Sequence, residues 1–90
     1  MHRYVIERDV PGLGALNREQ VKGVAATSNA ALDKLRGKVQ WVQSFVTDDK
    51  SFCVYLAEDE DLVREHARLS GIPASKITEV RSVIDPTTAN

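Results

Sequence analysis

The chain has 90 residues, with 12 basic and 13 acidic side chains and a formal net charge of −1. This balance excludes the bulk electrostatic attraction by which basic proteins bind nucleic acid or anionic membranes, so we expect neither partner. No apolar run approaches the roughly 20 residues of a transmembrane helix, and the polar start MHRYVIERD lacks the pattern of a signal peptide. The one cysteine cannot form an internal disulfide. We therefore expect a single cytoplasmic domain over residues 1–90, with a frayed tail at 86–90.

A strand and a capped helix are predicted at the start of the chain. Residues 3–9 (RYVIERD) are rich in β-branched side chains, and turn-forming residues follow at 10–14 (VPGLG). Asn17 is a suitable N-cap for the helix, Gln20 completes a capping box, and Gly37 ends the element. Small or apolar side chains recur at helical spacing on one stripe: Val21, Val24, Ala25, Ser28, Ala31, Leu32 and Leu35.

A hairpin, a second helix and a last strand are predicted next. Residues 39–57 (VQWVQSFVTDDKSFCVYLA) contain two runs rich in valine and aromatic residues around a polar tip. Asp59 is a suitable N-cap for the second helix, and Gly71 is a suitable left-handed stop. Residues 77–84 (ITEVRSVI) predict the last strand.

The order of these elements predicts an α+β fold of the ferredoxin-like βαββαβ type. Such a fold has a four-stranded antiparallel sheet with both helices on one face, and right-handed crossovers place the first and third strands at its centre. Alternation along the strands assigns residues to the open face. The expected set is Val5, Glu7, Trp41, Gln43, Phe45, Cys53, Tyr55, Glu79, Arg81 and Val83. Monomers rarely expose an apolar patch of that size, so we expect a second copy to cover it in a homodimer.

A ligand site is expected in the space between the two sheets of this dimer. The candidate ligand-binding residues are Glu7, Trp41, Gln43, Tyr55 and Arg81. Buried charges need partners, so Glu7 and Arg81 are expected to pair. The alternative is that these polar groups only satisfy one another.

His66 is the most informative single residue. It follows Leu62 and Val63 by three or four positions, so it is expected to face inward. A neutral imidazole there can bind a metal, transfer a proton, or simply hydrogen-bond a carbonyl. Cys53 has no basic neighbour in sequence and is expected to be a buried thiol. The sequence contains no Ser-His-Asp signature, phosphate-binding glycine loop or dinucleotide-binding fingerprint.

Four stretches carry a family resemblance: YVIERD, SNAAL, WVQSFVTDDKSFCVYLAEDED and VREHARLSGIPASKITEVRSVIDP. Over nearly its whole length the chain resembles small nickel-binding, ferredoxin-like proteins of the dimeric α/β-barrel type, a family described as a domain of unknown function. The pattern formed by His66, Gly71 and Pro73 is one residue longer than the family's H-x-x-x-G-x-P. The resemblance implies a dimer built sheet to sheet, and nickel or another divalent metal held by histidine and carboxylate ligands. His66 and Glu7 are the positions onto which those ligand roles are carried.

Together these inferences predict a non-catalytic, homodimeric protein that binds a divalent metal such as nickel or a small ligand. The alternative is a cofactor-free enzyme of the dimeric α/β-barrel type, a monooxygenase or an isomerase, with His66 as acid or base. A third interpretation is a purely structural dimer with a filled space between its sheets. Geometry separates them, because a catalytic His66 must open into a pocket with room for a substrate.

Overall fold

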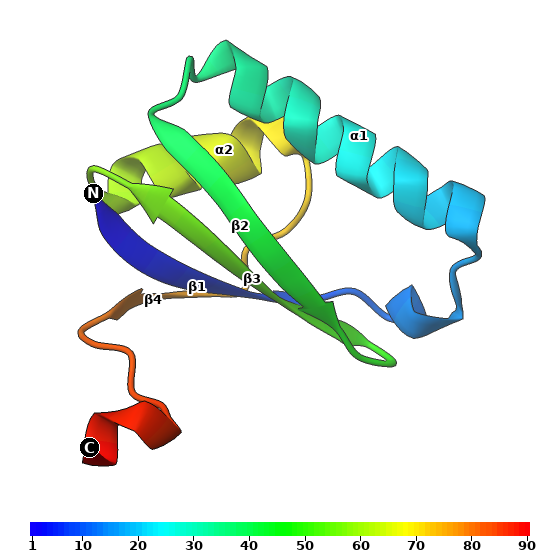
Figure 1. Ribbon diagram of the computed structural model, residues 1–90. Helices are drawn as coiled ribbons and strands as arrows, with labels where there is room; N and C mark the ends of the chain where they lie inside the picture. The colour runs from blue at the N-terminus through cyan, green and yellow to red at the C-terminus, as the bar shows by residue number, and fades with distance from the viewer.

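The computed structural model describes residues 1–90 as a sheet with two helices on one of its faces (Figure 1). The elements are β1 (His2–Asp9), the 3-10 helix η1 (Leu13–Ala15), α1 (Arg18–Lys34), β2 (Val39–Val46), β3 (Lys50–Ala57), α2 (Glu60–Ser70), β4 (Lys76–Val80) and the 3-10 helix η2 (Pro86–Ala89). All strand pairs are antiparallel, in the order β2-β3-β1-β4. The predicted ferredoxin-like α+β fold is confirmed, with the first and third strands at the centre.

Both helices begin at the predicted caps. The Asn17 side chain accepts a hydrogen bond from the Gln20 backbone N–H, and the Gln20 side chain accepts one from the Asn17 N–H, both at 2.9 Å. The Asp59 carboxylate accepts from the Leu62 N–H at 3.0 Å. At the other end of α2, Gly71 has a φ of 69°, the left-handed conformation that glycine adopts without steric cost.

The last strand is shorter than the predicted range 77–84. β4 ends at Val80, which lies opposite Arg3, and the pairing of β4 with β1 stops at this pair. The chain then leads away from the sheet into η2, which is exposed throughout (Figure 1). The sequence predicts a frayed tail here, whereas the structure has a short 3-10 helix capped by Asp85, whose carboxylate accepts from the Thr87 N–H at 2.8 Å.

The core lies between the sheet and the helices. Its buried apolar members are Tyr4, Ile6, Leu35, Val39, Cys53, Tyr55, Ala57 and Val63. Most of them come from the helix-facing side of the three strands β1, β2 and β3. The expected burial of Cys53 is therefore observed, although on the face opposite to the predicted one.

A β-bulge in β2 changes which residues face the helices. The register shifts between Trp41 and Gln43, so that Trp41 pairs with Tyr55 and Gln43 with Val54. Strict alternation would place Trp41 and Gln43 on the same face, but because of the bulge they lie on opposite faces. Trp41 is turned toward the helices, where its Nε1 donates to the Ser44 Oγ at 2.9 Å.

Candidate functional site

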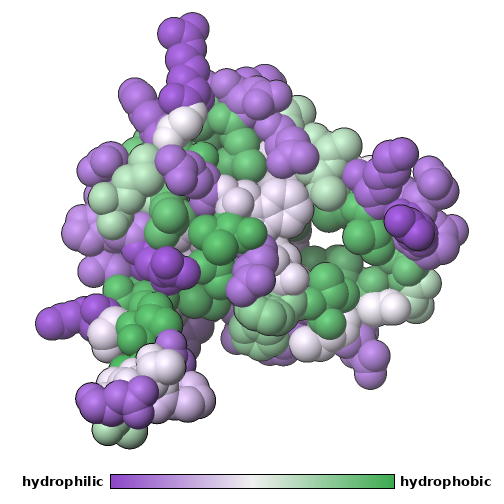
Figure 2. All heavy atoms as spheres, viewed as in Figure 1, coloured by the Kyte–Doolittle hydropathy of each residue, from purple (hydrophilic) through white to green (hydrophobic).

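A cavity of about 420 Å³ lies between α1 and the helix-facing side of the sheet. Its volume falls in the range of small-molecule sites, roughly 300–1,000 Å³. Eleven of its seventeen lining residues are hydrophobic, so the wall is largely apolar. In the space-filling view the molecule is hollowed between α1 and the hairpin end of β2, and the atoms around the opening are largely green (hydrophobic) or nearly white (Figure 2).

Three valines of this wall are exposed because the cavity leaves them uncovered. Val21 and Val24 of α1 are 44% and 40% exposed, and Val46 of β2 is 52% exposed. Side chains of this type are favoured in contact with other apolar groups, and leaving them in water costs free energy in proportion to the exposed area. The wall therefore presents apolar surface to whatever fills the cavity.

The hairpin tip is fastened at one end of the cavity by the segment that follows β1. The Gly14 N–H donates to the Asp48 carbonyl at 2.9 Å, and the Val10 N–H donates to the Asp49 carbonyl at 2.9 Å. A Cβ at Gly14 would lie only 2.8 Å from the Asp48 Cα, so this approach requires glycine. Val10 and Leu13 from the same segment line the cavity.

Arg8 is the only charged residue in the cavity wall. Its side chain is 2% exposed, and its Nη1 donates to the Ile72 and Pro73 carbonyls, both at 2.9 Å. Its Nη2 is buried without any hydrogen-bond partner. No carboxylate forms an ion pair with it. The cavity thus has a buried positive charge that the chain itself leaves uncompensated.

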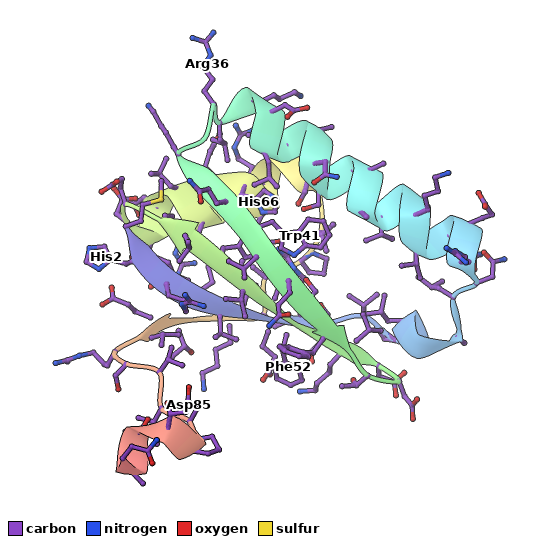
Figure 3. The ribbon with its side chains drawn as sticks, in the orientation of Figure 1. His2, Arg36, Trp41, Phe52, His66 and Asp85 are labelled. Atoms are coloured by element: carbon purple, nitrogen blue, oxygen red, sulfur yellow. The ribbon has the colours of Figure 1, made fainter.

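His66 lies behind this wall, fully buried between α2 and the sheet (Figure 3). Its Nε2 is 3.2 Å from the Ser28 Oγ, and its ring centroid is 4.8 Å from that of Tyr55. Its Nδ1 has no partner, and the residue does not line the cavity. Burial lowers the pKa of His66, and the nearby Arg8 charge lowers it further, so both favour the neutral imidazole.

Tyr55 connects His66 to the cavity, which its side chain lines. Burial raises the pKa of the Tyr55 hydroxyl, and the neighbouring Ser28 hydroxyl and Arg8 guanidinium act against that rise. The hydroxyl consequently remains protonated and able to donate a hydrogen bond. Arg8, Ser28 and Tyr55 together form a small polar cluster, which we call the Arg8 cluster, and Ser44 and Ser51 are the other residues of the wall that carry hydroxyl groups.

The structure separates the predicted ligand-binding residues. Trp41 and Tyr55 face the helices and line the cavity, whereas Glu7 and Gln43 lie on the open face. Arg81 lies beyond the end of β4 and is exposed. The expected face is therefore wrong for Trp41 and Tyr55, and Arg81 lies outside the strand in which it was expected. The bulge explains Trp41, and the early end of β4 explains Arg81.

The expected ion pair of Glu7 with Arg81 is also absent. Glu7 instead pairs with Lys50, with the Lys50 Nζ 3.2 Å from a Glu7 carboxylate oxygen. Lys50 makes a second contact of 3.2 Å with Asp9. Glu79, also expected on the open face, lies opposite Tyr4 and accepts a hydrogen bond from its hydroxyl at 3.4 Å.

The residues of one chain do not fit a nickel centre. His66 packs on the helix side of the sheet and Glu7 lies on the open face, so one ion cannot contact both within a chain. No group of three or more His, Cys, Asp or Glu side chains is placed to hold a metal. The cationic Arg8 near His66 further disfavours a divalent cation there. A role for His66 and Glu7 as ligands of one metal ion therefore requires an assembly of more than one chain, and that role stays a prediction.

Arg8 and the exposed valines were not among the site residues predicted from the sequence. One signal for Arg8 was present, because strand alternation that places Val5 and Glu7 outward makes Arg8 an inward-facing charge. An inward charge without a local partner marks a functional position more often than a surface charge does. Its acceptors at Ile72 and Pro73 are too distant in sequence to be identified without the fold.

Comparison with known proteins gives one family and one structure. The family model described as "Nickel responsive protein SCO4226-like" matches residues 4–80. The chain is similar to the structure titled "Crystal structure analysis of SCO4226 from Streptomyces coelicolor A3(2)", with a TM-score of 0.74 and 15% sequence identity, over 91% of this chain and 99% of that one. No match was found among curated proteins. No helix of the molecule combines the length and apolar character needed to cross a membrane.

Proposed function

Since this chain belongs to the SCO4226-like family of nickel responsive proteins, we propose that it acts by binding and not by catalysis, with a small organic molecule in the α1–sheet cavity as its ligand. The observation that carries the proposal is the cavity itself, because it has the volume and the apolar wall of a small-molecule site. Three of its valines stay exposed until something covers them. The family description supports a role related to nickel, and the cavity adds a second kind of ligand.

The position of His66 supports binding over the enzyme alternative. A general acid or base must come within hydrogen-bond reach of its substrate. His66 is fully buried, bonds to Ser28 and does not line the cavity, so it does not meet a molecule bound there. The cavity offers a ligand hydroxyl groups, one guanidinium and apolar surface.

We expect the neutral fluorophore 1-aminoanthracene to bind in the cavity and to become brighter there, because it leaves water for an apolar site. Trp41 is the only tryptophan and lines the cavity, so its emission should fall as the dye binds. Ala25→Leu fills the cavity with an apolar side chain and should weaken dye binding by about ten-fold or more. Ala26→Leu is the matched control, because Ala26 is the next residue of α1, is exposed and does not line the cavity.

Dye binding that is equal in Ala25→Leu and wild type would place the dye elsewhere, on the open face above all. No binding to the wild-type protein would rule out the cavity as an apolar site. The titrations are followed by dye emission and by Trp41 quenching, which report the same event from the two partners.

The open sheet face supports a homodimer as the working form. It carries a patch of apolar side chains, which we call the open-face patch: Val5, Phe45, Phe52, Val54, Leu56 and Val80. Phe45 is 56% exposed, and Phe52 points away from the helices (Figure 3). Surfaces of this kind usually mark an interface, and a second copy offers an identical patch.

We expect Phe45→Lys to convert the dimer into a monomer, because it places a charge within the apolar open-face patch. Sedimentation velocity measures the change, and Ala30→Lys on the exposed side of α1 is the control for the added charge. The same experiment with added nickel tests the family role. A nickel-dependent increase in mass would support metal ligands shared between copies, whereas a monomeric wild-type protein with and without nickel would contradict the proposed dimer.

A further inference from the structure

We propose that the ligand of the cavity is an amphipathic monocarboxylate, with its carboxylate at Arg8 and an apolar body along the remainder of the wall. The inference rests on the proposed function, because it names the chemical class of the molecule that the same cavity takes.

The charge of Arg8 requires a counter-charge that the chain does not provide. The side chain is 2% exposed and makes no ion pair. Burying a guanidinium is costly unless an opposite charge and hydrogen-bond acceptors compensate it. The carbonyls of Ile72 and Pro73 accept from Nη1, but Nη2 has no acceptor. A water molecule would satisfy the Nη2 hydrogen bond and leave the charge uncompensated, whereas an anion satisfies both needs.

The size of the Arg8 cluster favours a carboxylate over a phosphate. One guanidinium supplies a single positive charge, which matches a monoanion. A carboxylate accepts short, charge-assisted hydrogen bonds from a guanidinium, and its second oxygen can accept from a hydroxyl such as that of Ser28 or Tyr55. Both residues line the cavity beside Arg8. A phosphate brings up to two negative charges, which the single guanidinium of this wall cannot balance.

The remainder of the wall selects an apolar body. Val21, Val24 and Val46 are at least 40% exposed, and Trp41 lines the same space. An aliphatic or aromatic body that covers these side chains gains free energy from the apolar area removed from water. A hydroxylated acid, such as a sugar acid, would place hydroxyl groups against these valines, which offer no hydrogen-bond partner, and would lose free energy.

The test compares ligands that differ in one group. Wild-type protein is titrated by calorimetry near neutral pH with octanoate, with 1-octanol and with acetate. The alcohol has the apolar chain without the charge, and acetate has the charge without the chain. We expect octanoate to bind at least about ten-fold more tightly than the alcohol, and acetate to bind more weakly than octanoate, because a charge-assisted pair adds to the apolar contribution.

Two variants assign the effect to Arg8. Arg8→Met removes the charge and keeps a long apolar side chain, so octanoate should lose its advantage over 1-octanol. Arg8→Lys keeps the charge without the planar fork and should retain part of the preference. If Arg8→Met does not fold, the comparison of acid with alcohol in wild-type protein still decides.

Failure of this inference is distinguishable from failure of the proposed function. Equal affinity for octanoate and 1-octanol, or an acid preference that persists in Arg8→Met, would overturn the monocarboxylate assignment and leave the apolar cavity in place. Binding of 1-aminoanthracene without binding of octanoate would do the same. If neither the dye nor the acid binds, the proposed function fails together with the inference.

Discussion

Replacing Ile6 with alanine is expected to lower the free energy of unfolding by about 2–5 kcal/mol. Ile6 is fully buried at the centre of the sheet, on β1, and packs in the core between the sheet and the helices. The substitution removes apolar contact area and leaves a cavity that rigid strands cannot close. A domain of this size has a total stability of roughly 5–15 kcal/mol, so the loss is a large fraction of it.

Urea denaturation followed by Trp41 fluorescence measures this loss. Val42→Ala is the control, because Val42 is also a β-branched strand residue but is 46% exposed. We expect the control to change the free energy of unfolding by no more than about 0.5–1 kcal/mol. Equal losses in the two variants would mean that the core is not centred on the helix-facing side of β1.

The elements and their order follow from local signals, which is why they could be predicted from the sequence. Asn17 with Gln20, Asp59, and Gly71 each act within one helical turn, and each has the predicted role. The order of elements then leaves few topologies, because crossovers are right-handed and sequential strands pair. The end of β4 was not predictable in this way, since it depends on how far β1 extends beside it.

The two faces of the sheet could not be assigned from hydrophobicity, because both faces of β3 are apolar. Cys53 and Tyr55 point toward the helices, while Phe52, Val54 and Leu56 point to the open face. A strand that is apolar on both sides gives no preference between the two registers, and a one-residue error exchanges the faces. The bulge in β2 also moves Trp41 to the face opposite Gln43, and no residue type near it in the sequence predicts a bulge there.

The candidate site depended on these face assignments and was therefore predicted only in part. Trp41 and Tyr55 belong to a ligand-sized cavity, but it lies under α1 and not between two sheets. Phe52, Val54 and Leu56, whose apolar character prevented assignment of the two faces of β3, belong to the open-face patch. One cause, a sheet with apolar side chains on both faces, thus explains the wrong site and supports the proposed dimer.

Acidification is expected to destabilise the protein through His66 as the pH falls from about 6.5 toward 5. Burial and the Arg8 charge lower the pKa of His66 in the folded state below that of the unfolded chain. Between those two pKa values the unfolded state binds more protons than the folded state. The free energy of unfolding therefore decreases as the pH decreases, with a slope of at most about 1.4 kcal/mol per pH unit for one group. Stability from this source is complete above about pH 6.5.

His66→Gln removes the titrating group and keeps a polar side chain beside Ser28. Urea denaturation at a series of pH values should show a smaller slope in this pH window for His66→Gln than for wild type, whatever the level of stability at neutral pH. His2→Gln is the control, because His2 is exposed and should leave the slope unchanged. The charged group acting on His66 is the cation Arg8, which opposes a second positive charge in the core. An unchanged slope in His66→Gln would mean that the imidazole accepts its proton as readily in the folded core as in water, and that Arg8 does not act on it.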